Sequence, residues 1–307
     1  MHPAPSIILF STLSGAGFGM MIWLGAGFGP SSRGFAFFAC GLALALATAG
    51  LFASLWHLGN PRRAWRALSQ WRSSWLSREG IFSIAALACF GIYALLWAAG
   101  QGRFIFPGVC GAMFALATIY ATSMIYAGIE AVPRWSKSPT PALFVAYATA
   151  GGGLGVTVAA LPFTDPPLAT LAVSAALLIA AAAVALWWRM RAAAIGLDAD
   201  GSTPETAIGL PALGRARLFE SPHSSPNYLF KEMVFRIGRK HADKLRRLAF
   251  GAAFILPLLL LGIAAAMPSW SPVLWLALPV HLAGVAASRW LFFAEAEHVV
   301  SLYYGYR

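Results

Sequence analysis

Side chains that could bind and protonate a small polar group gather between Trp56 and Gly80, in the segment WHLGNPRRAWRALSQWRSSWLSREG. This segment combines His57, a helix-stopping Gly-Asn-Pro, five arginines and one carboxylate, Glu79. Histidine titrates near neutral pH, and a carboxylate can exchange protons with water. Because long apolar runs flank the segment on both sides, we expect this chemistry at a membrane surface.

The composition is that of an integral membrane protein. Hydrophobic residues make up 59% of the chain and charged residues only 11%, whereas about a quarter of a soluble protein is charged. Apolar windows of about 20 residues, enough to cross a bilayer as a helix, occur near residues 5–28, 34–58, 80–100, 105–128, 141–161, 168–188, 248–267 and 272–294. The windows are continuously apolar rather than alternating, which excludes a membrane barrel. We therefore predict an all-α bundle of eight transmembrane helices, forming a single polytopic domain over residues 1–307.

The distribution of cations predicts the orientation of this bundle. Nineteen lysines and arginines fall on the side that holds both termini, whereas Arg33 and Arg103 fall on the other side and Arg289 lies within the last span. By the positive-inside rule both termini are cytoplasmic, as in a multi-pass protein of the bacterial inner membrane. The formal net charge of +11 is then explained by topology, and we expect no nucleic-acid partner.

The longest predicted loop, 189–247, is basic and cytoplasmic. Near its end Leu229, Met233 and Ile237 recur at helical spacing among lysines and arginines, which predicts an amphipathic helix. Two alternatives remain open for this helix. It could lie on the anionic inner leaflet, or it could form a docking surface for a soluble cytoplasmic subunit.

Small residues in the first span are typical of close helix packing. The motif GAGFG occurs twice, at Gly15–Gly19 and at Gly25–Gly29. A dinucleotide-binding fingerprint would require a preceding strand, which does not fit here, whereas glycines let membrane helices approach closely. Cysteines at 40, 89 and 110 fall in three different spans, so we interpret them as packing residues and expect no metal site.

The last span adds further ionisable groups at the cytoplasmic end. Arg289 lies about two turns from that end, and Glu295 and His298 follow. The topology brings these residues to the same depth as His57 and Glu79. A quinone requires hydrogen bonds to its carbonyl oxygens and exchanges two protons per turnover, which suits such a set. We predict a quinone site formed by His57, Arg62, Trp71, Trp75, Arg78, Glu79, Arg289, Glu295 and His298. A simpler explanation for part of it is that Arg78 and Glu79 form an interfacial pair at a helix start.

A haem held by two histidines is not expected. Such a haem needs histidines that face each other at similar depth, but His281 falls in the outer half of the last span and His57 at the inner end of the second. We therefore expect electrons to reach a quinone directly from an adjacent iron–sulfur protein.

Two segments resemble a known family. HLGNPRRA at 57–64 and LSRE at 76–79 resemble the HLG-x-P-x-R-A and L-S-x-E segments of the DmsC-type membrane anchors of molybdopterin oxidoreductases, and SRWLFFAEAEH at 288–298 resembles their last helix more weakly. The resemblance covers most of the chain. It implies a haem-free anchor, itself without a catalytic centre, that binds a four-cluster iron–sulfur subunit and a molybdopterin catalytic subunit and exchanges electrons with ubiquinone or menaquinone. His57 and Glu79 match positions implicated in quinol binding in that family.

The predicted orientation favours one branch of this family. In the dimethyl-sulfoxide reductase branch the HLG-x-P end lies on the external face, whereas the cation count places His57 on the cytoplasmic face. The inversion looks more like the anchor of a cytoplasm-facing sulfite dehydrogenase, the SoeC type, with both partner subunits on the cytoplasmic side. The alternatives are an anchor of a dimethyl-sulfoxide or related reductase that oxidises quinol, and a membrane transporter. A transporter typically has polar groups near the bilayer midplane, whereas here they gather at one interface.

Overall fold

The protein is a bundle of long helices. The computed structural model describes residues 4–56, 61–197, 199, 201–217, 219–220 and 241–303, and in this part of the chain every regular element is helical. Eight segments there are long and apolar enough to span a membrane, which confirms the predicted number. They are α1 (Pro5–Gly25), α2 (Arg33–Leu55), α3 (Trp75–Ala98), α4 (Ile105–Ala127), α6 (Thr140–Ala160), α7 (Leu168–Ala193), a seventh span of α11 (Ala242–Phe250), η3 (Gly251–Ile255) and α12 (Leu256–Ala266), and an eighth of η4 (Pro268–Leu276) and α13 (Ala277–Ala294). The short helices are η1 (Pro61–Gln70), α5 (Pro133–Ser136), α8 (Pro204–Ala207), η2 (Pro211–Leu213) and α14 (Val300–Tyr303).

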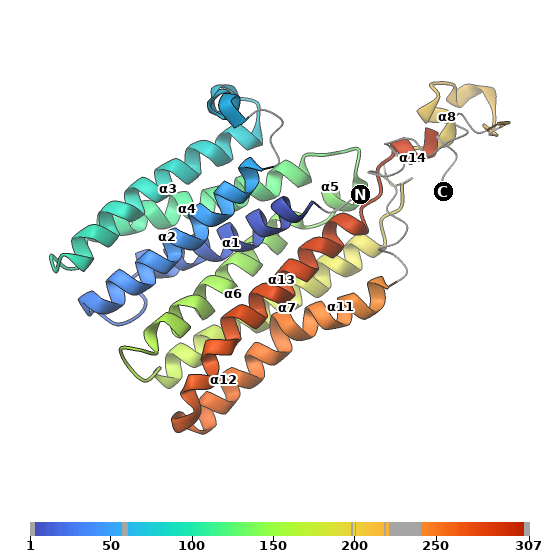
Figure 1. Cartoon of the computed structure of the whole chain (residues 1–307). Coiled ribbons are helices and arrows are strands. Elements are labelled where there is room, and N and C mark those ends of the chain that lie inside the picture. Colours follow the sequence, from blue (N-terminus) through green and yellow to red (C-terminus); the bar gives the residue numbers. More distant parts are fainter. Residues whose placement is uncertain are drawn as a thin grey trace.

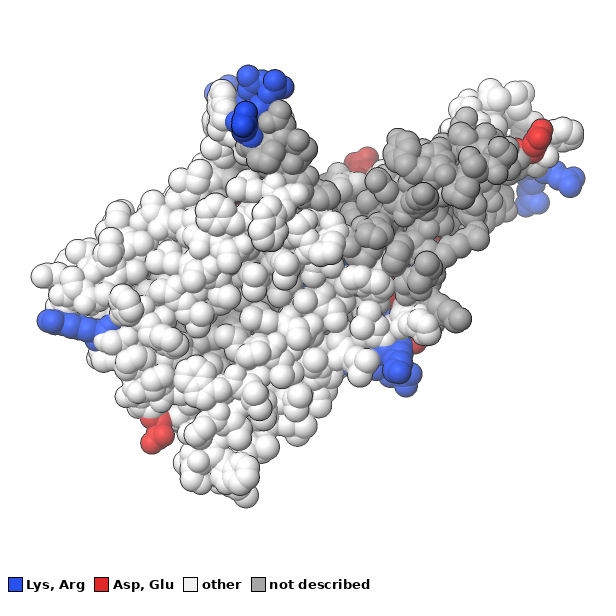
Figure 2. Space-filling view, viewed as in Figure 1, with Lys and Arg blue, Asp and Glu red and all other residues white. Residues whose placement is uncertain are grey.

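The spans run side by side, and α1 and α6 form the centre of the bundle (Figure 1). The start of α1 lies at the same end as η1, which projects from the bundle between α2 and α3. Figure 2 shows Lys and Arg gathered on that projection, while the flank of the bundle presents almost no charge. This surface suits contact with lipid tails along the flank and with water or a partner at the ends.

The glycines of the first GAGFG motif lie where α1 meets its neighbours. A Cβ at Gly19 would lie 2.7 Å from the carbonyl carbon of Ala148 in α6, and one at Gly17 would lie 2.8 Å from the Cα of Ala47 in α2. Side chains larger than hydrogen would keep these helices apart. The packing function predicted for this motif is therefore confirmed, and it fits helix association in a membrane, where close van der Waals contact is the main attraction.

The second GAGFG motif confirms the packing prediction at its first glycine, where a Cβ on Gly25 would lie 3.1 Å from the carbonyl carbon of Gly108 in α4, whereas its other two glycines form a turn. Helix α1 ends at Gly25, and Gly27 and Gly29 adopt φ of 90° and 91° in the turn that follows. L side chains rarely adopt these dihedrals, so glycine is required there by backbone conformation rather than by packing. Arg103 holds the turn, since its guanidinium donates to the carbonyls of residues 27, 29 and 30, the second at 2.6 Å.

The seventh span contains one turn of π-helix, η3, beside the eighth span. A π turn widens the helix and offers carbonyls to groups outside it. Here His281 of α13 contacts one of these carbonyls: its Nδ1 lies 2.6 Å from the carbonyl oxygen of Ala253, and the side chain is fully buried. Gly284, one turn further on, lets the backbone of η3 approach α13 closely.

The predicted loop 189–247 is shorter at both ends than expected. Helix α7 continues to Ala193 and α11 begins at Ala242, because the cationic residues there extend the apolar helices into the polar boundary. The predicted amphipathic helix with Leu229, Met233 and Ile237 lies outside the described residues, so its two alternatives stay predictions.

Candidate functional site

The tryptophan- and arginine-rich segment forms a cationic projection over the start of α3. Arg78 ties it to the bundle: its Nε donates to the carbonyl of Trp71 at 2.9 Å, its Nη2 donates to that of Arg72 at 2.6 Å, and its Cζ lies 4.3 Å from the Trp75 ring centre. Trp71 and Arg62 are exposed. The segment thus presents aromatic rings and positive charge just outside the apolar core.

Glu79 lies inside α3 rather than at its start. Ser74 caps the helix, which begins at Trp75, a turn earlier than the apolar window indicated. The carboxyl is 5% exposed and contacts the hydroxyl of Thr122 in α4. The guanidinium of Arg78 turns away from it and binds backbone carbonyls instead. The interfacial Arg78–Glu79 pair is therefore not the arrangement seen in this part of the chain.

The contact with Thr122 fits either protonation state of Glu79. The Thr122 hydroxyl has a single hydrogen, but it lies within reach of both the carboxyl of Glu79 and the carbonyl of Thr118, the latter at 2.9 Å. When the carboxyl is ionised, the hydroxyl can donate to it. When the carboxyl carries a proton, it can donate to the hydroxyl, which then donates to Thr118. The site can hold a proton without leaving a buried polar atom unpaired.

His57, the first residue of the predicted set, lies outside the described residues. It follows Trp56, which is 80% exposed at the end of α2. Its contacts with Glu79 or with η1 therefore stay a prediction.

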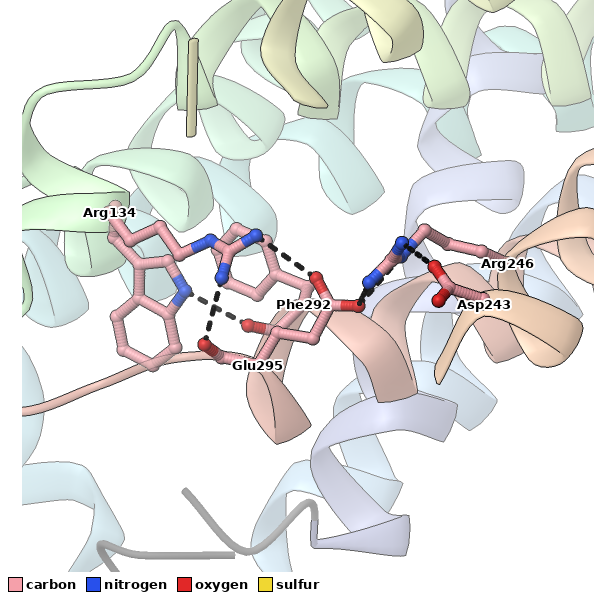
Figure 3. A network of polar contacts seen from close by, with 6 residues as sticks. Arg134, Asp243, Arg246, Phe292 and Glu295 are labelled. Atoms are coloured by element: carbon pink, nitrogen blue, oxygen red, sulfur yellow. Dashed lines mark hydrogen bonds and ion pairs between the residues drawn. The ribbon is translucent and has the colours of Figure 1, made fainter. Parts of the chain in front are cut away.

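Glu295, one of the predicted residues at the end of the last span, lies in a second group of polar contacts (Figure 3). Glu295 accepts from two arginines: Arg134 Nη2 lies 3.1 Å from Oε2, and Arg246 Nη2 lies 2.7 Å from Oε1. Arg246 also pairs with Asp243 one turn away. His298 Nδ1 accepts from the backbone N–H of Val300 at 3.0 Å. Glu295 thus joins α5 and α11 to the end of α13, while the bond of His298 is local to the segment that follows.

Arg289 is buried without a carboxylate. Its side chain is 3% exposed, and its Cζ lies 3.5 Å from the ring centre of Phe144 and 5.3 Å from that of Tyr147. Neither Nε nor Nη1 has a hydrogen-bond partner among the described residues. Cation–π contact stabilises the charge, but the donors are left unsatisfied.

Tyr126 of α4 lies between the two groups. It follows Thr122, the partner of Glu79, by one turn of the same helix, and its ring centre lies 5.5 Å from that of Phe144, over which Arg289 lies. The predicted residues therefore share one end of the bundle but not one pocket: Arg62, Trp71, Trp75, Arg78 and Glu79 lie with α3 and η1, and Arg289, Glu295 and His298 lie with α13.

Sequence reasoning missed the partners of these groups. Thr122, Tyr126 and Arg134 come from α4 and α5, and each is separated from its predicted counterpart by more than 40 residues. A threonine and a tyrosine within an apolar span are weak signals, because both occur as ordinary packing residues. Arg134 was counted only as a topological charge.

The eight apolar spans define a multi-pass membrane protein. A family model described as DMSO reductase anchor subunit (DmsC) matches residues 2–197, and the chain belongs to this family. It is a membrane anchor of a molybdopterin oxidoreductase family and associates with other oxidoreductase subunits. Over 99% of both chains it is 32% identical to the C subunit of the sulfite dehydrogenase of Allochromatium vinosum. No solved structure matches it.

Proposed function

We propose that this chain anchors a sulfite dehydrogenase in the bacterial cytoplasmic membrane and that a quinone is reduced beside Glu79. The similarity to the C subunit of a sulfite dehydrogenase over nearly the full length of both chains supports the first part. In this proposal both termini and both partner subunits, a molybdopterin subunit and a four-cluster iron–sulfur subunit, lie in the cytoplasm. The excess of cations at that end supports the orientation.

The buried contact between Glu79 and Thr122 is the main observation that supports a quinone site here. A quinone bound here would accept two electrons from the iron–sulfur subunit and two protons, and it would leave as quinol. The carboxyl of Glu79 can take up one of those protons and release it again, because the Thr122 hydroxyl forms a hydrogen bond with both the protonated and the ionised carboxyl. The residue is thus suited to proton transfer between the cytoplasmic surface and a headgroup.

The surroundings of Glu79 also fit a quinone. Leu68 of η1 packs against α3 at Gly80, where a Cβ would lie 2.6 Å from the Leu68 methyl group. The η1 segment therefore covers the start of α3 directly beside the carboxyl. The exposed Trp65 in this segment and Trp71 just after it offer flat apolar faces for a ring, and Arg62 supplies a donor for a carbonyl oxygen. In the proposed site His57 is the second donor, and Trp71, Trp75 and Arg78 shape the entrance.

Replacement of Glu79 in the intact complex tests this site. Glu79→Gln should leave sulfite oxidation with a soluble dye unchanged, while turnover with a short-chain ubiquinone or menaquinone analogue falls about 100-fold, as expected for one general acid–base group. Glu130→Gln is the matched control, since Glu130 is exposed. His57→Ala should resemble Glu79→Gln. Normal quinone-coupled rates in both variants would reject the site, and a lack of sulfite oxidation by the wild-type complex would reject the assignment to sulfite.

Thr122→Val separates proton transfer from binding. The valine keeps the shape of the side chain but removes the hydroxyl that pairs with Glu79 in both protonation states. We expect quinone-coupled turnover to fall while the KM for the analogue changes little. If KM rises and kcat stays constant, Thr122 contributes to the packing of the site rather than to proton transfer.

A further inference from the structure

A small pocket opens between α6, α7, α11 and α13, away from Glu79 and η1. Its volume is about 70 Å³, and three arginines line it: Arg189, Arg246 and Arg289. We call it the arginine pocket. A cavity of this size holds several water molecules, and so it has room for one tetrahedral oxyanion.

The charges around the arginine pocket do not balance. Glu295 is the one carboxylate among its lining residues, and that carboxylate is already shared between Arg246 and Arg134. Arg289 lies at the base, almost fully buried, with two donor nitrogens that have no partner among the described residues. Burying an unpaired ion costs several kcal/mol. An anion in this pocket would both neutralise the charge and accept the free hydrogen bonds.

The rim of the pocket points to a lipid as the source of that anion. Leu186 on α7 lines the pocket and is 44% exposed, and α7 is the least buried of the spans. Phe250 and Leu143 add apolar surface, whereas Arg189 is exposed at the polar end of α7. An apolar rim beside exposed cations at the end of a membrane helix is the arrangement that receives a phosphate group with its acyl chains along the flank.

We propose that the arginine pocket binds the phosphate group of an anionic phospholipid, with Arg289 at its base and Arg189 and Arg246 at its rim. The bound lipid holds α7 against the seventh and eighth spans, which follow it after a long connection. This site is separate from the proposed quinone site and does not depend on it.

Thermal unfolding of the purified, delipidated full-length protein tests the proposal. Phosphatidylglycerol should raise the melting temperature, whereas phosphatidylcholine, whose headgroup is neutral overall, should raise it much less. Arg189→Gln should weaken the effect of phosphatidylglycerol roughly fivefold in apparent affinity, the loss expected for one interfacial cation. The matched control is Arg191→Gln, because Arg191 is also exposed near the end of α7 but does not line the pocket.

Replacement of the buried arginine gives an independent measurement. Arg289→Met should abolish the response to phosphatidylglycerol without lowering the melting temperature of the lipid-free protein, since methionine leaves no donor unpaired. If Arg289→Met does not fold, the Arg189→Gln comparison still decides. An equal response in Arg189→Gln and Arg191→Gln overturns the proposal. An equal effect of inorganic phosphate alone overturns the lipid as source, and loss of binding of a quinone analogue in Arg189→Gln assigns the pocket to the quinone instead.

Discussion

Replacing Gly19 with alanine should destabilise the bundle, although alanine is the better helix former. The new Cβ would lie 2.7 Å from the carbonyl carbon of Ala148 and closer still to its oxygen, whereas carbon atoms prefer a separation of roughly 3.5–4.0 Å. Helices α1 and α6 would have to separate by about 1 Å. A gap of that size loses up to about half of the local dispersion energy.

The expected cost follows from these distances. Overpacking of this kind costs about 1–3 kcal/mol, and alanine returns up to about 1 kcal/mol through its helix propensity. We expect Gly19→Ala to lower the free energy of unfolding by about 1 kcal/mol, the difference between these two amounts. The control is Gly41→Ala in α2, where a Cβ meets no atom within 4 Å. There the propensity acts alone, so the variant should be neutral or slightly more stable.

Both variants can be compared by tryptophan fluorescence during thermal unfolding in the same detergent. The two substitutions are chemically identical and lie in neighbouring spans of the same protein, so detergent effects cancel. Equal melting temperatures for the two variants, or a higher one for Gly19→Ala, would refute the reasoning that the first GAGFG motif sets the distance between α1 and α6.

Three further outcomes are expected. A reporter fused after Arg307 should be active only in the cytoplasm and one fused at Gln101 only outside it; the reverse pattern would overturn the orientation derived from the cations. Glu295→Ala should lower the free energy of unfolding of the purified protein by about 3 kcal/mol, because it leaves two partly buried arginines without their shared carboxylate. A loss of only a few tenths of a kcal/mol would mean that these ion pairs are merely surface contacts. Burial lowers the pKa of His298, so the folded state favours the neutral ring that accepts from the N–H of Val300. Stabilisation by that bond should be complete above the ordinary histidine pKa of about 6.5 and should weaken as the pH falls below it. Amide exchange at Val300 between pH 5 and 8 would detect this as a protection factor, relative to the base-catalysed intrinsic rate at each pH, that falls at low pH.

The sequence was sufficient to predict the spans, because the backbone N–H and C=O groups of a continuously apolar window can all be paired in a bilayer only if the window forms a helix. Boundaries were less predictable where charge and helix overlap. Arg189 was assigned to a loop but lies in α7, and Glu79 was placed at the start of a span but lies inside one. Long cationic side chains can reach the membrane surface from within a helix, so a charge does not mark where a helix ends.

The candidate site was predictable only in part. The residue types and the shared end of the bundle followed from topology alone. The division into two groups did not, because it depends on which spans pack together. Thr122 pairs with Glu79 since α3 and α4 are neighbours, and Arg134 pairs with Glu295 across 161 positions. Neither pairing leaves a periodic signal, since each depends on how helices far apart in sequence come together.

The pairing of Arg134 with Glu295 also sets an order of events during synthesis. The two residues are 161 positions apart, so at about 5–20 residues per second the carboxylate leaves the ribosome roughly 8–30 s after the arginine. Four spans precede Arg134, and three more are synthesised during that interval before the last one, while the contacts that α1 and α6 make with α13 have yet to form. Closure of the bundle is therefore the last step of its biogenesis. A nascent chain that stops before α13 would leave exposed the faces of α1 and α6 that pack against that helix.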